Sequence, residues 1–266
     1  MHHVTGFDPA QLEPQPAYAD HSVGYRRVSH IDRGVGAIRT GFGTCELAAG
    51  GSIDPHVHSY EELVYVVAGA PCLSPDGLTY RISPDDAAFI GVGATHSWHA
   101  PDSEPCRWID LQTPQARDAT DPADTFFVPS GVGTGPEPVS VRDPRARFFA
   151  HWQPSQMLLD ERHGAFLGTM FMVDYQCDVV LHPHDHPVEE AFYMLEGEVV
   201  FIADGTEYTL AVGDVAYAGV GCIHAFENRS GKKTRWLETR APLPPLHHSY
   251  RFNRDWDFLA EQFGTA

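Results

Sequence analysis

Apolar residues along this chain fall into short runs separated by glycine, proline and aspartate, a pattern typical of short β-strands joined by turns. Such runs follow one another from Gly34 onward, as at Val64–Val67. An Asp-Gly pair stands between apolar runs at Asp76–Gly77 and again at Asp204–Gly205, which is a strong hairpin signal. Helical periodicity is nearly absent from this part of the chain. The pattern predicts an all-β protein.

The final segment of the chain departs from the strand pattern. Apolar side chains recur at helical spacing there, Asn253 can cap the first turn and Gly264 can end the last one. The pattern predicts a short C-terminal helix that packs on a barrel or on a second subunit. Its apolar positions are Phe252, Trp256, Leu259 and Phe263.

A pattern of histidine and glutamate occurs twice in the chain. His56, His58, Glu62 and His96 are repeated 128 residues later as His184, His186, Glu190 and His224. No gap is needed between the two copies, and other residues match as well: glutamate doublets (Glu61–Glu62, Glu189–Glu190), tyrosines (Tyr65, Tyr193) and glycines (Gly69, Gly197). A period of this length is too long for a solenoid unit. It indicates a duplicated domain.

Composition and the position of turn-rich segments set the predicted domain boundaries. The 266 residues, 42% of them hydrophobic, suffice for two compact domains. The segment 113–145 is rich in proline, glycine and aspartate and reads as the connection between them. The predicted parts are an N-terminal arm (1–33), a first barrel (34–112), a linker with a lead-in strand (113–159), a second barrel (160–240) and a C-terminal tail with the helix (241–266).

The charge and the cysteines narrow the function classes. The formal net charge of −18 disfavours nucleic acid and anionic lipid as partners. No apolar run approaches the roughly 18 residues of a membrane span, and the start of the chain lacks a secretory signal. The five cysteines are odd in number and scattered, which favours reduced thiols and a cytoplasmic protein.

The spacing of the repeated residues predicts metal binding. Side chains two apart on a strand project to the same face, so His184 and His186 can point into one cavity, and Glu190 can join them at even spacing. His224 lies some forty residues later in the chain, and a closed antiparallel barrel returns such a segment beside the first strand. Imidazoles with one carboxylate form a typical site for a divalent transition metal. The same reasoning applies to His56, His58, Glu62 and His96.

These spacings resemble the two motifs of the cupin family. The first motif, G-x5-H-x-H-x3-4-E-x6-G, is complete from Gly50 to Gly69, and its second copy ends at Gly197 but has Asp178 in place of the leading glycine. The second motif, G-x5-P-x-G-x2-H-x3-N, is matched by Gly213, Gly221, His224 and Asn228, with Gly219 replacing the proline. In the first half Asp85, Gly91 and Ala100 replace the glycine, proline and asparagine.

The resemblance implies two tandem jelly-roll-like β-barrels, each holding a metal through three histidines and one glutamate. Fe(II) or Mn(II) is favoured, with Ni(II) or Zn(II) as alternatives. The resemblance does not fix the reaction, because similar barrels include dioxygenases, decarboxylases, isomerases, aminohydrolases and storage proteins.

Strand parity predicts which residues line the cavities. Positions in phase with the ligands should face inward, whereas Glu61, Glu189, Tyr65 and Tyr193 should point away. We expect both cavities to be apolar apart from the ligands, with no interior arginine or lysine. The second half is favoured for catalysis because it keeps Asn228, with Glu190 and His224 as catalytic residues. The expected pocket residues are Phe192, Met194 and Phe226 in the second barrel and Val64, Val66 and Trp98 in the first.

Three functions remain open at this point. The first is a dioxygenase-type oxidoreductase that binds O2 and a small, partly apolar substrate at the metal. The second is non-oxidative Lewis-acid chemistry by an isomerase, decarboxylase or aminohydrolase. The third is a binding or storage protein, which the complete ligand sets disfavour. A homodimer is expected because the arm and the C-terminal helix are free to pack on another subunit.

Overall fold

The computed structural model describes residues 1–74, 79–117, 124–128, 139–140, 147–148, 155–242 and 251–252. The Asp76–Gly77 turn and the predicted C-terminal helix from Asn253 onward lie outside these residues, whereas Phe252, the first apolar position of that prediction, lies in strand β22 (Arg251–Phe252). Every helical segment among the described residues is a short 3₁₀ turn: η1 (Pro9–Gln11), η2 (Pro16–Tyr18), η3 (Arg33–Val35) and η4 (Glu161–His163). No described helix is long and apolar enough to cross a membrane.

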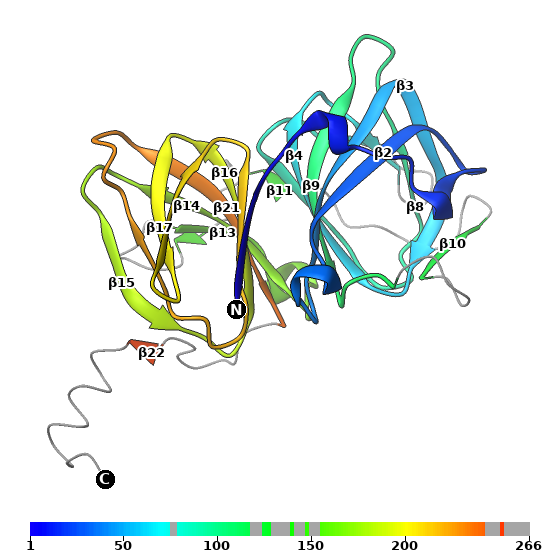
Figure 1. Ribbon diagram of the computed structural model, residues 1–266. Helices are drawn as coiled ribbons and strands as arrows, with labels where there is room; N and C mark the ends of the chain where they lie inside the picture. The colour runs from blue at the N-terminus through cyan, green and yellow to red at the C-terminus, as the bar shows by residue number, and fades with distance from the viewer. Residues whose placement is uncertain are drawn as a thin grey trace, which may run out of the picture.

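The two halves of the chain form two antiparallel β-barrels that lie side by side (Figure 1). The expectation of an all-β protein is confirmed. In the first half a single 18-residue strand, β3 (Gly41–His58), bends through both walls of its barrel, whereas in the second half two strands, β14 (Thr169–Tyr175) and β15 (Val180–Asp185), take its place. The first barrel contains β2 (Ser22–Ile31), β3 (Gly41–His58), β4 (Glu61–Ala68), β5 (Cys72–Leu73), β6 (Tyr80–Arg81), β7 (Asp86–Ile90), β8 (His96–His99) and β9 (Cys106–Thr113).

The second barrel repeats this order. Its strands are β13 (Ser155–Leu159), β14 (Thr169–Tyr175), β15 (Val180–Asp185), β16 (Glu189–Glu196), β17 (Glu198–Ala203), β18 (Thr206–Ala211), β19 (Asp214–Ala218), β20 (His224–Glu227) and β21 (Thr234–Ala241). The remaining strands are β1 (His2–Gly6), β10 (Thr125–Phe127), β11 (Val139–Ser140), β12 (Arg147–Phe148) and β22 (Arg251–Phe252). Strand β10 pairs with the histidine end of β3, and β22 pairs with the histidine end of β15.

Alternation along the strands divides the apolar residues into three cores. One face of β4 places Val64 and Val66 inside the first barrel, and the corresponding face of β16 places Phe192 and Met194 inside the second. The opposite faces meet between the barrels, where Tyr65, Leu63 and Phe42 pack in one cluster with Tyr193, Ala191 and Leu237. This shared core explains why both faces of the central strands are apolar.

Two departures from the glycine pattern turn out to preserve backbone conformation. Asp85 and Asp178 stand where the other copy has Gly213 and Gly50, and all four residues have positive φ, from 63° to 90°. Aspartate is one of the few residues that tolerates this left-handed region. The turn geometry is therefore conserved between the halves although the residue is not.

The N-terminal arm pairs within its own chain. Strand β1 lies along β19 of the second barrel, and β2 lies along β3 of the first, so the arm crosses from one barrel to the other (Figure 1). These segments are not free to pack on another subunit, as the sequence-based argument for a homodimer assumed. The homodimer itself stays a prediction.

The first glutamate of each doublet fastens one barrel to the other. The Glu189 carboxylate accepts hydrogen bonds from the backbone N–H groups of Ile38, Arg39 and Thr40, at 2.7, 3.0 and 2.9 Å. Reciprocally, Glu61 accepts from the N–H groups of residues 166 and 167, at 2.9 and 2.8 Å. Both carboxylates are buried. Their outward direction, expected from parity, therefore gives them a role at the interface of the barrels.

Replacing Glu189 with glutamine is expected to destabilise the protein. The glutamine amide supplies one acceptor oxygen in place of two and turns an N–H group toward the backbone N–H donors. We therefore expect the free energy of unfolding to fall by about 2–3 kcal/mol and the melting temperature to fall by roughly 5–10 °C. Thermal unfolding followed by circular dichroism measures this. Glu198→Gln, at an exposed position, is the matched control and should leave the melting temperature unchanged. Equal melting of the two variants would contradict a structural role for Glu189.

Candidate metal centres

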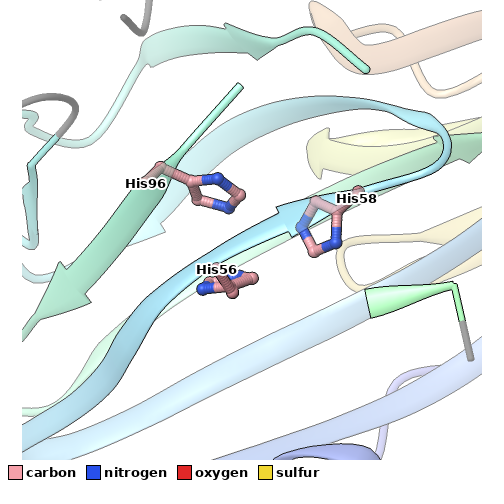
Figure 2. Close-up of side chains that lie close together, drawn as sticks. All are labelled: His56, His58 and His96. Atoms are coloured by element: carbon pink, nitrogen blue, oxygen red, sulfur yellow. The ribbon is translucent and has the colours of Figure 1, made fainter. Parts of the chain in front are cut away.

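The first histidine cluster forms where β3 and β8 run side by side. His56 is directly opposite His96 in the strand pairing, after a β-bulge that follows Ile53. The donor nitrogens of His56, His58 and His96 all lie within 4.8 Å of one another, and the three rings are buried (Figure 2). Residues far apart in sequence therefore meet at one point inside the first barrel.

Backbone carbonyl groups orient these rings. The Nδ1 atoms of His56 and His96 lie 2.7 Å and 3.0 Å from the carbonyl oxygens of Asp54 and Ala94. A carbonyl oxygen only accepts hydrogen bonds, so each Nδ1 carries the proton and each Nε2 keeps a lone pair. Such outer hydrogen bonds fix the tautomer and orientation of metal-binding histidines.

Glu62 completes the first cluster. Its Oε2 atom lies 3.3 Å from His58 Nε2 and 3.7 Å from His96 Nε2. Glu62 Oε2 and His96 Nε2 are buried polar atoms without a hydrogen-bond partner. Such orphaned atoms are costly unless something compensates them, and a divalent cation between the carboxylate and the imidazoles would do so. The donor set fits a transition metal.

Burial keeps the histidines of the first cluster neutral. It lowers the pKa values of His56 and His58 to about 3. Burial, together with the nearby Asp110, raises the pKa of Glu62 to about 8. Neutral imidazoles are the form that binds metal.

The second barrel repeats this cluster between β15 and β20. His184 and His224 are directly opposite each other, and their Nδ1 atoms lie 2.7 Å and 3.0 Å from the carbonyl oxygens of residues 182 and 222. Glu190 Oε2 is 2.9 Å from His186 Nε2 and 3.0 Å from His224 Nε2. The second donor set is as complete as the first.

An arginine distinguishes the second centre. Arg240 Nε donates to the other oxygen of Glu190, Oε1, at 2.5 Å, and Arg240 Nη2 donates to Glu238 at 3.1 Å. Trp236 also donates to Glu238, at 3.1 Å. Burial alone raises the pKa of Glu190, but His186 and Arg240 outweigh it and hold this pKa well below its usual range. Glu190 is therefore fixed as a carboxylate.

The first barrel obtains its arginine from a different strand. Gln112 and Asp110 occupy the positions equivalent to Arg240 and Glu238. Arg27 on β2 pairs with Asp110 through three hydrogen bonds of 2.9–3.2 Å, and Gln112 donates to the same carboxylate. The expectation that neither interior would contain an arginine is therefore wrong. The motifs gave no sign of Arg27 and Arg240, because both lie on strands outside them.

A cavity of about 360 Å³ is lined in part by three residues that contact the histidines of the first centre, although none of the four candidate ligands is in its lining. Its wall contains Tyr60, whose ring stacks on His58 at 4.4 Å, and Tyr18 of the arm, whose ring meets His56 edge-on at 5.6 Å. Thr125 of β10, also in the wall, lies 3.2 Å from His58 Nδ1. The lining comprises Gln15, Pro16, Ala17, Tyr18, Tyr25, Arg27, Ser29, Asp32, Gly41, Tyr60, Gln112, Gln115, Ala116, Arg117, Asp124 and Thr125.

The six residues predicted to shape the substrate pockets lie inside the barrels. Val64, Val66 and Trp98 belong to the core of the first barrel, and Phe192, Met194 and Phe226 to that of the second. None of them is in the lining of the cavity described above. Half of the lining of that cavity belongs to the N-terminal arm, which motif parity does not reach. The contact of these six residues with a substrate stays a prediction.

Asn228, the reason for favouring the second half, closes a turn. Its amide donates to the carbonyl oxygens of Gln176 and Lys232 and accepts from Ser230. These contacts hold the turn between β20 and β21. The motif asparagine therefore gives no reason to place the reaction in the second barrel, and the catalytic assignment of Glu190 and His224 stays a prediction.

The buried histidines predict acid sensitivity of the metal-free protein. A histidine with a pKa of about 3 when folded and about 6.5 when unfolded contributes stability above pH 6.5 that is lost as the pH falls toward 3. Glu62 acts in the opposite direction between pH 4.5 and about 8. Below pH 4.5 we therefore expect the free energy of unfolding of His58→Gln to fall less steeply with decreasing pH than that of the wild-type protein, by up to about 1.4 kcal/mol per pH unit. Urea unfolding of the chelated proteins between pH 4.5 and 3.5 measures this difference, and parallel slopes would contradict it.

Comparison with known proteins gives the family. The cupin domain model matches residues 43–112 and 171–240, more than half of the chain. A search of curated protein sequences found no match.

Solved structures share the fold across the chain. Oxalate decarboxylase from Bacillus subtilis has a TM-score of 0.68 at 14% identity, covering 99% of this chain and 83% of its own. Oxalate decarboxylase from Lactobacillus farciminis, in a formate complex, has a TM-score of 0.68 at 16% sequence identity, and the match covers 99% of this chain and 94% of that one. A variant of salicylate 1,2-dioxygenase from Pseudoaminobacter salicylatoxidans, in complex with gentisate, has a TM-score of 0.69 at 12% sequence identity, and the match covers 91% of this chain and 82% of that one. At these identities the likeness concerns the fold. The chain belongs to the cupin family and consists of two cupin domains in tandem.

Proposed function

We propose that this protein is a metal-dependent enzyme of the dioxygenase type whose first barrel acts on a small, partly apolar organic substrate. The observation that supports this most is a cavity whose wall contains polar side chains together with Tyr18 and Tyr60, the tyrosines whose rings contact His56 and His58. About 360 Å³ lies within the usual size range of small-molecule sites.

The charges around the cavity narrow the class of substrate. The lining has two cationic side chains, and each is already paired: Arg27 with Asp110, and Arg117 with Asp124 at 2.6 Å. A polyanion would find no uncompensated cation in this lining and would have to separate one of these pairs. Rings of Tyr18, Tyr25 and Tyr60 offer faces for stacking on a planar molecule. The lining thus favours a hydroxylated ring or a diketone.

Each residue of the first centre has a part in this proposal. His56, His58, His96 and Glu62 would hold the metal, and four protein ligands leave about two positions of an octahedral ion open. Iron(II) bound there would supply the electron transfer between substrate and O2. Tyr60 orients the ring of His58 by stacking, and Thr125 contacts its Nδ1. Tyr18 and β10 cover this end of the barrel and limit access of water.

Non-oxidative Lewis-acid chemistry is the second candidate. It is favoured by the glutamate in both donor sets and by the likeness to oxalate decarboxylases over 99% of the chain. Mn(II), Ni(II) or Zn(II) would then polarise a carbonyl group of a small acid. The paired arginines count against an oxalate-like dianion.

Oxygen consumption separates the two candidates. The metal-free protein, reloaded with Fe(II), is expected to consume O2 with a panel of hydroxylated aromatic acids and diketones, whereas the metal-free protein is not. The same panel and a set of small carboxylic acids are then tested with Mn(II) under strict anaerobiosis. Turnover without O2, combined with no O2 uptake by the iron form, would overturn the oxidative proposal in favour of the second.

A further inference from the structure

We propose a third metal site, outside both histidine clusters, formed by His2, Asp204 and Cys222 and suited to zinc. The three residues come from distant parts of the sequence. His2 begins strand β1, Asp204 is in the turn between β17 and β18, and Cys222 lies just before β20. Their donor atoms lie within 4.8 Å of one another.

The distances match the edges of a tetrahedral site. Asp204 Oδ2 lies 3.3 Å from His2 Nδ1 and 3.5 Å from Cys222 Sγ. With zinc bonds of about 2.0 Å to nitrogen and oxygen and about 2.3 Å to sulfur, a tetrahedron has N–O and S–O edges of roughly 3.3 and 3.5 Å. Both edges that include Asp204 therefore match, and the third, between the His2 and Cys222 donor atoms, is at most 4.8 Å. The fourth position remains for another donor. The Met1 ammonium group donates a hydrogen bond to the same carboxylate oxygen at 3.2 Å and would have to lose a proton before it could bind the ion.

Hydrogen bonds to neighbouring groups orient the donor atoms of His2 and Asp204 toward the proposed metal position. His2 Nε2 lies 2.9 Å from the Tyr208 hydroxyl group, which can accept its proton and leave the Nδ1 lone pair facing Asp204. Asp204 Oδ1 accepts from the backbone N–H of Ile223 at 3.1 Å, so Oδ2 is the oxygen turned toward the other donors. Cys222 is buried. The supporting contacts resemble those around the histidines of the two larger clusters.

The donor chemistry distinguishes this site from the other two. Thiolate sulfur selects zinc and other soft or borderline ions, whereas the histidine and glutamate clusters contain no sulfur. On binding, a metal–sulfur bond forms and the thiol proton leaves to solvent. The ion would join β1 to the 204–205 turn and to residue 222, whose carbonyl oxygen orients His224 of the second centre. The site would thereby fasten the N-terminal strand beside that centre.

Cobalt substitution tests the site without any assay of activity. The metal-free protein is titrated with Co(II) chloride, and the near-ultraviolet sulfur-to-cobalt charge-transfer band is recorded with the number of ions bound. We expect three equivalents per chain and a band in the wild-type protein. Cys222→Ser should lack the charge-transfer band and should bind two equivalents of Co(II) in place of three. The control Cys177→Ser removes an exposed free cysteine and should retain the band and the third equivalent.

A second variant guards against misfolding of Cys222→Ser. His2→Gln changes a part-buried residue at the start of the chain, and it should weaken the third equivalent of zinc at least tenfold in competition with a chelator. A band absent from the wild-type protein, a band that survives in Cys222→Ser, or unchanged zinc affinity in His2→Gln would overturn the proposal.

Discussion

Replacing His58 with alanine is expected to remove one metal equivalent and nearly all turnover, whereas replacing His186 should remove one equivalent and leave much of the turnover. The reason is the cavity whose wall includes Tyr60, the tyrosine that stacks on the His58 ring. Loss of contacts outside the ligand sphere commonly costs about 10–100-fold in affinity or activity, so loss of a ligand should exceed about 100-fold in kcat/KM. Elemental analysis and steady-state kinetics of both variants measure this.

The paired design makes the outcome informative. His58 is the last residue of β3, the equivalent His186 directly follows β15, and both side chains are equally buried, so any general cost of losing a metal appears in both variants. Melting curves with metal confirm that each variant is folded. If His186→Ala abolishes turnover and His58→Ala spares it, the reaction belongs to the second barrel, as the motif asparagine suggested from sequence.

Replacing Arg240 with methionine is expected to lower the free energy of unfolding by about 3–5 kcal/mol, because it removes one partner of a buried ion pair. Glu190 and Glu238 would remain as two buried carboxylates without their cation. The melting temperature should fall by roughly 6–20 °C at a conversion of about 2–4 °C per kcal/mol. The metal affinity of the second centre should also fall, since Arg240 holds Glu190 ionised. Calorimetry of the chelated and metal-loaded variant measures both effects.

An exposed arginine supplies the control for this variant. Arg229 pairs with Glu207 and Glu227 at the surface, where its side chain is 49% exposed. Solvent screens such surface pairs and they contribute little to stability, so Arg229→Met should melt close to the wild-type protein. If Arg240→Met melts no lower than Arg229→Met, the buried arginine does not stabilise the second barrel.

Much of the fold follows from local pattern. The constant 128-residue offset, the Asp-Gly turns and the alternation of apolar residues predicted two antiparallel barrels, and the family model and the sheets confirm them. Parity also predicted that His56 and His58 share a face and that Tyr65 and Tyr193 face away, because the period of two is a property of each strand alone. The hairpin at Asp204–Gly205 has the positive φ values that its sequence indicates.

The partners of those faces could not be derived in this way. Glu61 and Glu189 point outward as parity requires, yet the N–H groups they bind lie more than 100 residues away in the chain. Arg27 and Arg240 sit on strands that carry no motif, so nothing in the spacing indicated which carboxylate each would reach. Tyr18 belongs to an arm whose path across both barrels depends on strand pairing.

The sequence by itself determined that the protein has two copies of one barrel and which side chains would gather inside each, since duplication and alternation are written along the chain. Only the tertiary structure decided that the two centres differ: one contacts tyrosines that line a cavity, and the other has an arginine on its glutamate. The physical reason is that periodicity fixes the direction of a side chain relative to its own strand. What that side chain meets depends on how strands distant in sequence are brought together.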